Sequence, residues 1–226
     1  MRFGVVQKQY SSLLLLRLVP IAAQVLLLGV LLSSVGPFHT GVIAFFIAGV
    51  AVFRGLASFG LDMETIRVSS RSLSDEGYLS RELFWHIIVR ATFTSAVASV
   101  LLALLGIFVP SPSNSIWAIS MCGFFGTMVG VLVSYLRPSK SLLKSQAFDT
   151  IGTSLMPTIA VSVFVITVGY NFLFVVFCYS ICSLATCVVL FSMALRQSQS
   201  LSSFESLDRR TWALNGISQS LTALNS

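Results

Sequence analysis

Six apolar runs, each about 20 residues or longer, constrain this chain more than any other feature of its sequence. An α-helix rises about 1.5 Å per residue, so a run of about 20 residues spans the hydrocarbon core of a bilayer. None of the runs alternates apolar and polar residues as a barrel strand does. We therefore predict an all-α integral membrane protein, a bundle of six transmembrane helices within residues 1–195. The predicted spans are 12–34, 41–61, 83–108, 115–136, 147–168 and 171–195.

The composition supports a membrane protein. Hydrophobic residues make up 55% and charged residues only 10% of the chain, whereas roughly a quarter of the residues in a soluble domain are charged. Between the second and third runs lies one charged stretch, residues 62–82, and two interpretations of it stay open. Its apolar residues permit an amphipathic helix on the membrane, and its serines favour a bare loop.

The basic residues predict the orientation. If the six spans alternate in direction, all 14 Lys and Arg residues fall in cytoplasmic segments or in the inner halves of helices. Short loops rich in Lys and Arg stay inside, so we expect both the N- and C-termini on the cytoplasmic side. The net charge of +6 then reflects topology and attraction to anionic lipid, and no nucleic-acid partner is needed.

Cysteine and histidine are too sparse and too scattered for a metal centre. Three of the four cysteines (Cys178, Cys182, Cys187) share the sixth predicted span, and the fourth, Cys122, lies in another. We interpret them as small packing residues and expect no metal and no cofactor. No sequence motif of a nucleophile, phosphate loop or zinc protease occurs, so we do not expect an enzyme.

Three arginines lie within the predicted spans, below the inner surface of the membrane. Arg17, Arg54 and Arg90 each stand six or seven residues from the inner end of their span, roughly 10 Å deep. Gln24 shares a helix face with Arg17, and Thr94 shares one with Arg90. We predict that these five residues line a common water-filled, cationic cavity that binds a phosphate-bearing lipid headgroup. The alternative is that each arginine separately extends its side chain to the headgroups.

Other polar and helix-breaking residues leave two interpretations each. Asp149, near the start of the fifth span, is a candidate for binding a coupling cation, although its position also fits a solvated carboxylate at the surface. Pro20 and Pro157 interrupt helical hydrogen bonding and produce either static kinks or hinges. Gly126 and Gly130 form a Gly-xxx-Gly pair, which favours close helix packing.

Residues 35–71 contain three short patterns around an apolar helix. They are a Gly-Pro-x-x-x-Gly connection (Gly36, Pro37, Gly41), a Phe-Gly-Leu-Asp turn (59–62) and an Ile-Arg pair (66–67). This stretch resembles the first two helices of bacterial polysaccharide flippases of the O-antigen type. That family belongs to the superfamily of multidrug, oligosaccharidyl-lipid and polysaccharide exporters.

The resemblance implies a function in the bacterial cytoplasmic (inner) membrane. Proteins of that family move lipid-linked oligosaccharide from the inner to the outer leaflet, by alternating access between two six-helix bundles. The implied partners are membrane lipid, the lipid-linked oligosaccharide and other membrane proteins of polysaccharide assembly. Residues 196–226 are then expected to be a cytoplasmic linker and the start of a truncated seventh helix, which would make the chain an N-terminal half. Two alternatives remain, namely a small-molecule or multidrug extruder of the same superfamily and a membrane scaffold without transport activity.

Overall fold

The computed structural model describes residues 3–76, 79–108, 115–138 and 142–199. Within helices, the side chains of residues 3–17, 74–76 and 142 are not part of that description. Two expectations therefore fall largely outside it. They are the side chain of Arg17 and the linker with a seventh helix, of which only residues 196–199 are described.

Six helical segments are apolar and long enough to cross a membrane, judged by length and composition. The prediction of six membrane-length α-helices is thus confirmed, and the chain has the character of a multi-pass membrane protein. Two short strands and helix α3 complete the described structure. The six segments are α1 (Phe3–Val35), α2 (Pro37–Ala57), α4 (Arg81–Phe108), α5 (Ser115–Leu136), a fifth made of α6 (Leu142–Thr150), π-helical η2 (Ile151–Leu155) and α7 (Met156–Thr167), and α8 (Phe172–Gln197).

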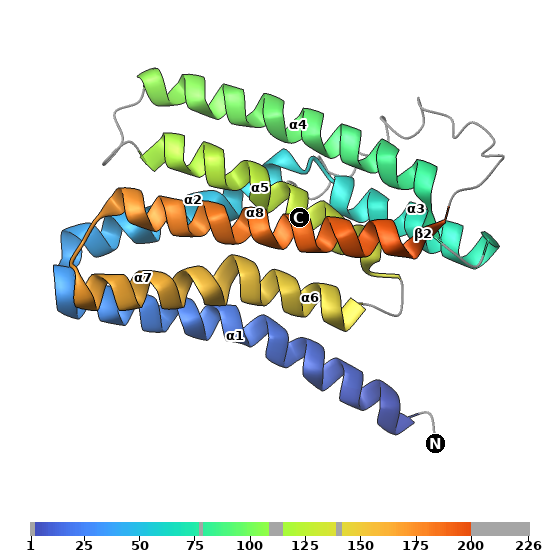
Figure 1. Ribbon diagram of the computed structural model, residues 1–226, viewed down its shortest axis with the longest axis horizontal. Helices are drawn as coiled ribbons and strands as arrows, with labels where there is room; N and C mark the ends of the chain where they lie inside the picture. Colours follow the sequence, from blue (N-terminus) through green and yellow to red (C-terminus); the bar gives the residue numbers. More distant parts are fainter. Residues whose placement is uncertain (1–2, 77–78, 109–114, 139–141, 200–226) are drawn as a thin grey trace, which may run out of the picture.

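Helix α5 is the centre of the bundle. It packs against α2, α4 and α8 along its length and also contacts α3 and α6 (Figure 1). Of its membrane-length segment 72% is buried, compared with 11% for α4 at the edge. The outer helices turn large apolar side chains outward, including Phe93 (68% exposed) and Phe108 (80% exposed) on α4. Such surfaces are stable against lipid tails and costly against water.

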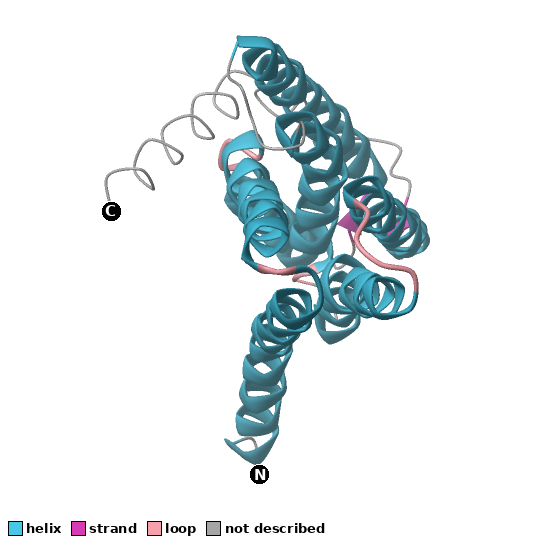
Figure 2. Ribbon diagram, turned by 90° about the vertical axis from the view of Figure 1, so that its left-hand side faces the viewer, coloured by secondary structure: helices cyan, strands magenta, loops and turns pink. Residues whose placement is uncertain are grey.

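Helix α1 lies at the opposite edge from α4 and packs against α2, α6 and α7. Its first turns leave the bundle and project away from the other helices (Figures 1 and 2). With 33 residues, α1 is about 50 Å long, more than the roughly 30 Å needed to cross hydrocarbon. The part of α1 that packs on the bundle includes Leu27 and Leu31, both fully buried.

The fifth span contains a π-helical turn between two α-helical parts. Pro157, near the start of α7, has no backbone N–H, so the carbonyl four residues earlier loses its usual helical donor. Residues 151–155 adopt the wider π turn at this point. Gly152 lies in that turn with its Cα directed at the hydroxyl of Thr186 on α8, where a Cβ atom would collide with Thr186. The proline and the glycine together explain why the helix widens here.

The charged stretch after α2 forms helix α3 (Leu61–Glu76), so a helix is correct for this part of residues 62–82. The chain turns through Phe59 and Gly60, both at positive φ (44° and 73°), before α3 begins. Glycine accepts that conformation without strain. The buried face of α3 carries hydroxyls at Thr65 and Ser69, and it packs against α5 instead of presenting an apolar face to lipid.

A two-residue parallel strand pair closes the same end of the bundle. Strand β1 (Leu79–Ser80) lies between α3 and α4, and it pairs with β2 (Ser198–Gln199), which follows α8. The buried hydroxyl of Tyr135, near the end of α5, donates a hydrogen bond to the carbonyl of Ser80 (3.0 Å). We refer to this part of the molecule as the α3 end.

Candidate functional site

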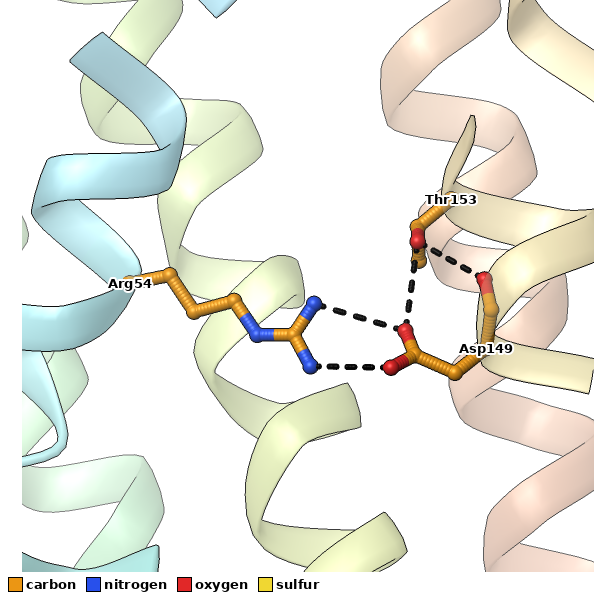
Figure 3. A network of polar contacts seen from close by, with 3 residues as sticks. All are labelled: Arg54, Asp149 and Thr153. Atoms are coloured by element: carbon orange, nitrogen blue, oxygen red, sulfur yellow. Dashed lines mark hydrogen bonds and ion pairs between the residues drawn. The ribbon is translucent and has the colours of Figure 1, made fainter. Parts of the chain in front are cut away.

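Arg54 and Asp149 form a two-bond ion pair inside the bundle (Figure 3). The Nη1 and Nη2 groups of Arg54 donate to Oδ1 and Oδ2 of Asp149 at 3.3 and 3.1 Å. Thr153, one turn along the fifth span, donates to the same Oδ1 (3.2 Å) and to the Asp149 backbone carbonyl (2.7 Å). The Asp149 carboxylate is therefore held from two sides. This fork-to-fork geometry is the strong form of an Arg–carboxylate contact.

Local sequence explains how Arg54 reaches across the bundle. It lies in the last turn of α2, and its side chain runs over α5 at Gly130. A Cβ atom at Gly130 would lie 3.0 Å from Nε and 3.2 Å from Nη2 of Arg54, closer than side chains normally approach. The other glycine of the pair, Gly126, lies 3.8 Å from the Arg54 side chain by the same measure. The glycines thus give the guanidinium its path.

The ion pair lines a cavity of about 330 Å³ among α1, α2, α3, α5 and α6. Two arginines and two aspartates contribute to its wall, so the formal charge of its lining is zero when all four are ionised. This space is therefore not cationic overall, because carboxylates from other helices stand beside the arginines. The lining residues are Pro20, Arg54, Asp62, Met63, Ile66, Gly130, Val133, Ser134, Arg137, Gln146, Asp149 and Thr150.

Asp62, in the first turn of α3, is the second carboxylate of the cavity. Its Oδ1 atom is buried without a hydrogen-bond partner among the described residues. Burial raises the pKa of the Asp62 carboxyl above its ordinary value, and the charge of Asp149 acts in the same direction. Arg54, the hydroxyl of Ser58 and Arg137 oppose the rise but do not cancel it. Asp62 therefore accepts a proton more readily than an ordinary aspartate.

Arg137 follows α5 and brings a second guanidinium to the cavity. Its Nε–H group is buried and has no acceptor among the described residues. A buried donor without an acceptor is costly, and a bound anion or water would remove that cost. The cavity thus holds an unused donor on Arg137 and an unused acceptor on Asp62.

The structure brings together only part of the predicted set. Arg54 lines the cavity and Asp149 is its partner. Arg90 and Thr94 lie on α4, and neither is a lining residue. The Thr94 hydroxyl donates to the carbonyl of Arg90 (3.1 Å) within its own helix. The guanidinium of Arg90 is attracted by the charge of Glu64 on α3.

The two residues predicted on α1 add little to the observed cavity. Gln24 is half-buried and does not line it, although Pro20, one turn earlier, does. The side chain of Arg17 lies outside the described part of the chain. The predicted meeting of Arg17, Arg54 and Arg90 is thus not seen, since Arg54 and Arg90 lie in different surroundings.

Sequence reasoning missed the roles of Asp62, Arg137 and Thr153. A usable clue was present for the first of them, because Asp62 follows α2 by only a short turn and so returns toward Arg54. Ionisable residues within apolar helices usually pair with one another, and this rule would have favoured an arginine partner for Asp149 over the coupling cation that we predict from the sequence. The distance between them in sequence, 95 residues, hid which arginine it was.

The described residues contain no group of three or more His, Cys, Asp or Glu arranged to hold a metal ion. Cys122 lies against Ser180 of α8, with Sγ and Oγ 3.1 Å apart, and all four cysteines are free thiols.

No known protein family, curated protein or solved structure matches the chain.

Proposed function

We propose that this chain is part of a membrane transport system that moves a lipid-linked oligosaccharide across the bacterial cytoplasmic membrane. The observation that carries the proposal is the Arg54–Asp149 pair on the wall of a polar cavity inside an apolar six-helix bundle. Ionisable side chains within membrane helices are expensive to insert, and they typically mark the path of a substrate or an ion. The resemblance of residues 35–71 to polysaccharide flippases supplies the class of substrate.

The chemistry of the cavity fits a phosphate-bearing headgroup. A guanidinium binds a phosphate through the same two parallel N–H bonds that it gives to a carboxylate. A headgroup that enters the cavity would take the place of Asp149 on Arg54 and find a second donor in Arg137. Its hydrocarbon tail would stay between the apolar outer faces of the helices. In the proposed orientation, with basic residues and both termini inside, the α3 end faces the cytoplasm.

The π turn supplies a place for movement. π-helical turns inside α-helices occur frequently at functional sites. Here the turn begins two residues after Asp149 and contains Thr153, which donates a hydrogen bond to the Asp149 carboxylate. Restoring regular α-helix there would rotate Asp149 relative to α7 and separate it from Arg54. We propose that this change accompanies the passage between inward-open and outward-open states.

One observation favours a second candidate, a small-molecule extruder. The cavity contains two carboxylates, Asp62 and Asp149, and carboxylates attract organic cations. An exporter of such cations would use the aspartates, whereas a flippase for phosphate-bearing lipids would use the arginines. The two candidates therefore differ in which charge is required.

Complementation tests the proposal directly. The complete gene, with Arg54→Ala or Asp149→Asn, is introduced into a strain that accumulates untranslocated polysaccharide precursor, and surface polysaccharide is measured at matched protein level. We expect Arg54→Ala to reduce surface polysaccharide to the level of the empty vector. The control is Arg67→Ala, because Arg67 is an exposed arginine of α3 that does not line the cavity.

The same strains are tested for resistance to the cationic dye ethidium. Full polysaccharide with Arg54→Ala contradicts the flippase proposal. If resistance to ethidium then depends on Asp62 and Asp149, the extruder is supported. Unchanged results in both assays would support a scaffold without transport activity.

A further inference from the structure

Two charged groups of the cavity, Asp62 and Arg137, form no ion pair with any described residue, and of the two only the Asp62 carboxyl can lose its charge, because a guanidinium stays protonated. Arg54 and Asp149 satisfy each other in a two-bond contact. Asp62 lines the same cavity but forms no ion pair with any described residue, and its Oδ1 has no hydrogen-bond partner. The Asp62 carboxyl is therefore the group whose charge state is least fixed by its neighbours.

We propose that Asp62 is a proton-binding residue that controls the binding of a phosphate-class anion between Arg54 and Arg137. The proposal rests on the function proposed above and adds a residue and a coupling ion to the same site. In the ionised state the four charged lining residues sum to zero, with two positive and two negative groups. A proton on Asp62 leaves the lining with one net positive charge. In that state Asp62 no longer repels an anion, and the attraction of Arg54 and Arg137 for the anion is less opposed.

The groups that face Asp62 from the neighbouring elements support this assignment. Arg54 approaches from α2, Arg137 from the end of α5, and Asp149 from α6. The Ser58 hydroxyl lies in the turn before α3, and α1 contributes the uncharged Pro20 to the wall. Burial raises the pKa of Asp62 in spite of the two arginines. An anion bound to those arginines would withdraw their support from the carboxylate and raise that pKa further.

Coupling follows from thermodynamic linkage. If the anion binds only when Asp62 is protonated, the proton and the anion each increase the affinity for the other by the same factor. Above the pKa of Asp62, the anion affinity then falls about tenfold for each unit of pH. A proton gradient would accordingly bias the loading of the cavity on one side of the membrane. The π turn contacts Asp149 through Thr153, so loss of the Arg54–Asp149 contact would change the hydrogen bonding of that turn.

Calorimetry with sulfate tests the proposal on the full chain purified in detergent. Sulfate is a tetrahedral dianion that does not titrate between about pH 5 and 9, so any pH dependence of binding comes from the protein. We expect binding to weaken by up to about tenfold per pH unit on the alkaline side. Titrations in two buffers of different ionisation enthalpy should show uptake of about one proton per sulfate.

The variant Asp62→Asn separates proton control from simple charge attraction. Asparagine keeps the shape of the side chain without a titrating group, so we expect tight binding at every pH and no proton uptake. The matched control is Glu82→Gln, which removes an exposed carboxylate outside the cavity and should leave the wild-type profile unchanged. The proposal is overturned if wild-type binding does not change with pH, or if Asp62→Asn keeps the wild-type pH dependence.

Farnesyl diphosphate, compared with sulfate at one pH, distinguishes a lipid headgroup from a free anion. Binding at least tenfold tighter for the lipid diphosphate supports a headgroup site, and similar binding supports a site for free anions. If Arg54→Ala binds both probes as tightly as the wild-type protein does, an anion site at Arg54 is excluded. These measurements need no transport, so a failure of binding and a failure of the flippase proposal are separate results.

Discussion

The sequence predicts similar depths for Arg54 and Arg90, yet the structure places Arg54 in the last turn of α2 and Arg90 well inside α4. Arg54 runs over a glycine of α5 and ends in a two-bond contact with Asp149 beside a cavity. Arg90 lies on the edge helix α4, is half-exposed, and is attracted by Glu64 across a helix boundary. A similar predicted depth therefore does not imply similar surroundings in the folded protein.

The largest difference is expected from removal of the two arginines in turn. Arg54→Ala should lower the free energy of unfolding by about 2 to 3 kcal/mol, because it leaves Asp149 without its cation. This is less than for a fully buried pair, since the Arg54 and Asp149 side chains keep 31% and 21% exposure. Thermal unfolding in detergent measures the loss. The double variant Arg54→Ala with Asp149→Ala should recover part of it, and a purely additive result would argue against the pair.

The second prediction concerns the π turn at residues 151–155, which lies next to the Asp149 partner of Arg54. Gly152→Ala should destabilise the protein by about 2 kcal/mol, because the new methyl group meets Thr186 of α8. The matched control is Gly55→Ala on α2, where nothing lies within 4 Å of the added Cβ and helix propensity favours alanine. Circular dichroism melts compare the two. Equal melting temperatures would mean that α8 does not hold the π turn at Gly152.

Asp62 should produce a smaller effect that depends on pH. Its pKa is raised in the folded protein, so the folded state keeps a proton that the unfolded chain releases near its ordinary value of 3.8. Stability from this group is present in acid and is lost as the pH rises through the raised pKa. Asp62→Asn should remove that decline and increase stability at pH 8 by about 1 kcal/mol. Urea titrations at pH values from about 4 to 8 measure the change, and an undiminished decline in the variant would refute the assignment.

The smallest effect is expected at Arg90. Arg90→Ala should cost about 0.5 kcal/mol, as is typical of a charge interaction that stays partly open to solvent, and added salt should reduce the cost. The same salt should change the effect of Arg54→Ala much less, because the Arg54 contact is more shielded from solvent. Melting temperatures in low and high salt check both. A salt-independent loss at Arg90 as large as that at Arg54 would remove the distinction between the two arginines.

Particular residues show what the sequence could predict. The six membrane-length helices follow from the length of the apolar runs, since each run satisfies its backbone hydrogen bonds only as a helix. The sequence leaves open whether residues 62–82 form a helix or a loop, because their serines suit both. In the structure Thr65 and Ser69 are buried, and Ser69 bonds the carbonyl of Thr65. Only the packing of α3 on α5 decides that question.

The site was predicted less completely than the helices. Position along each predicted span marks Arg54 as an unusual cation, but position along a helix carries no information about rotation around the bundle. The placement of α4 at the edge, away from α1, separates Arg90 from the cavity. Asp149 and Asp62 belong to other segments, and the tertiary fold alone brings them to Arg54. Pairs of this kind are long-range properties that no local pattern encodes.

The strand pair at the α3 end has a mechanical consequence. Backbone pairing of β1 with β2 fastens the exit of α8 to the entrance of α4, and Tyr135 anchors Ser80 from α5. Tension on the chain beyond Gln199 would therefore pull on β1 and on α3, which carries Asp62, as well as on α8. A force on the chain after β2 would thus reach the charged cavity through the two paired residues of each strand.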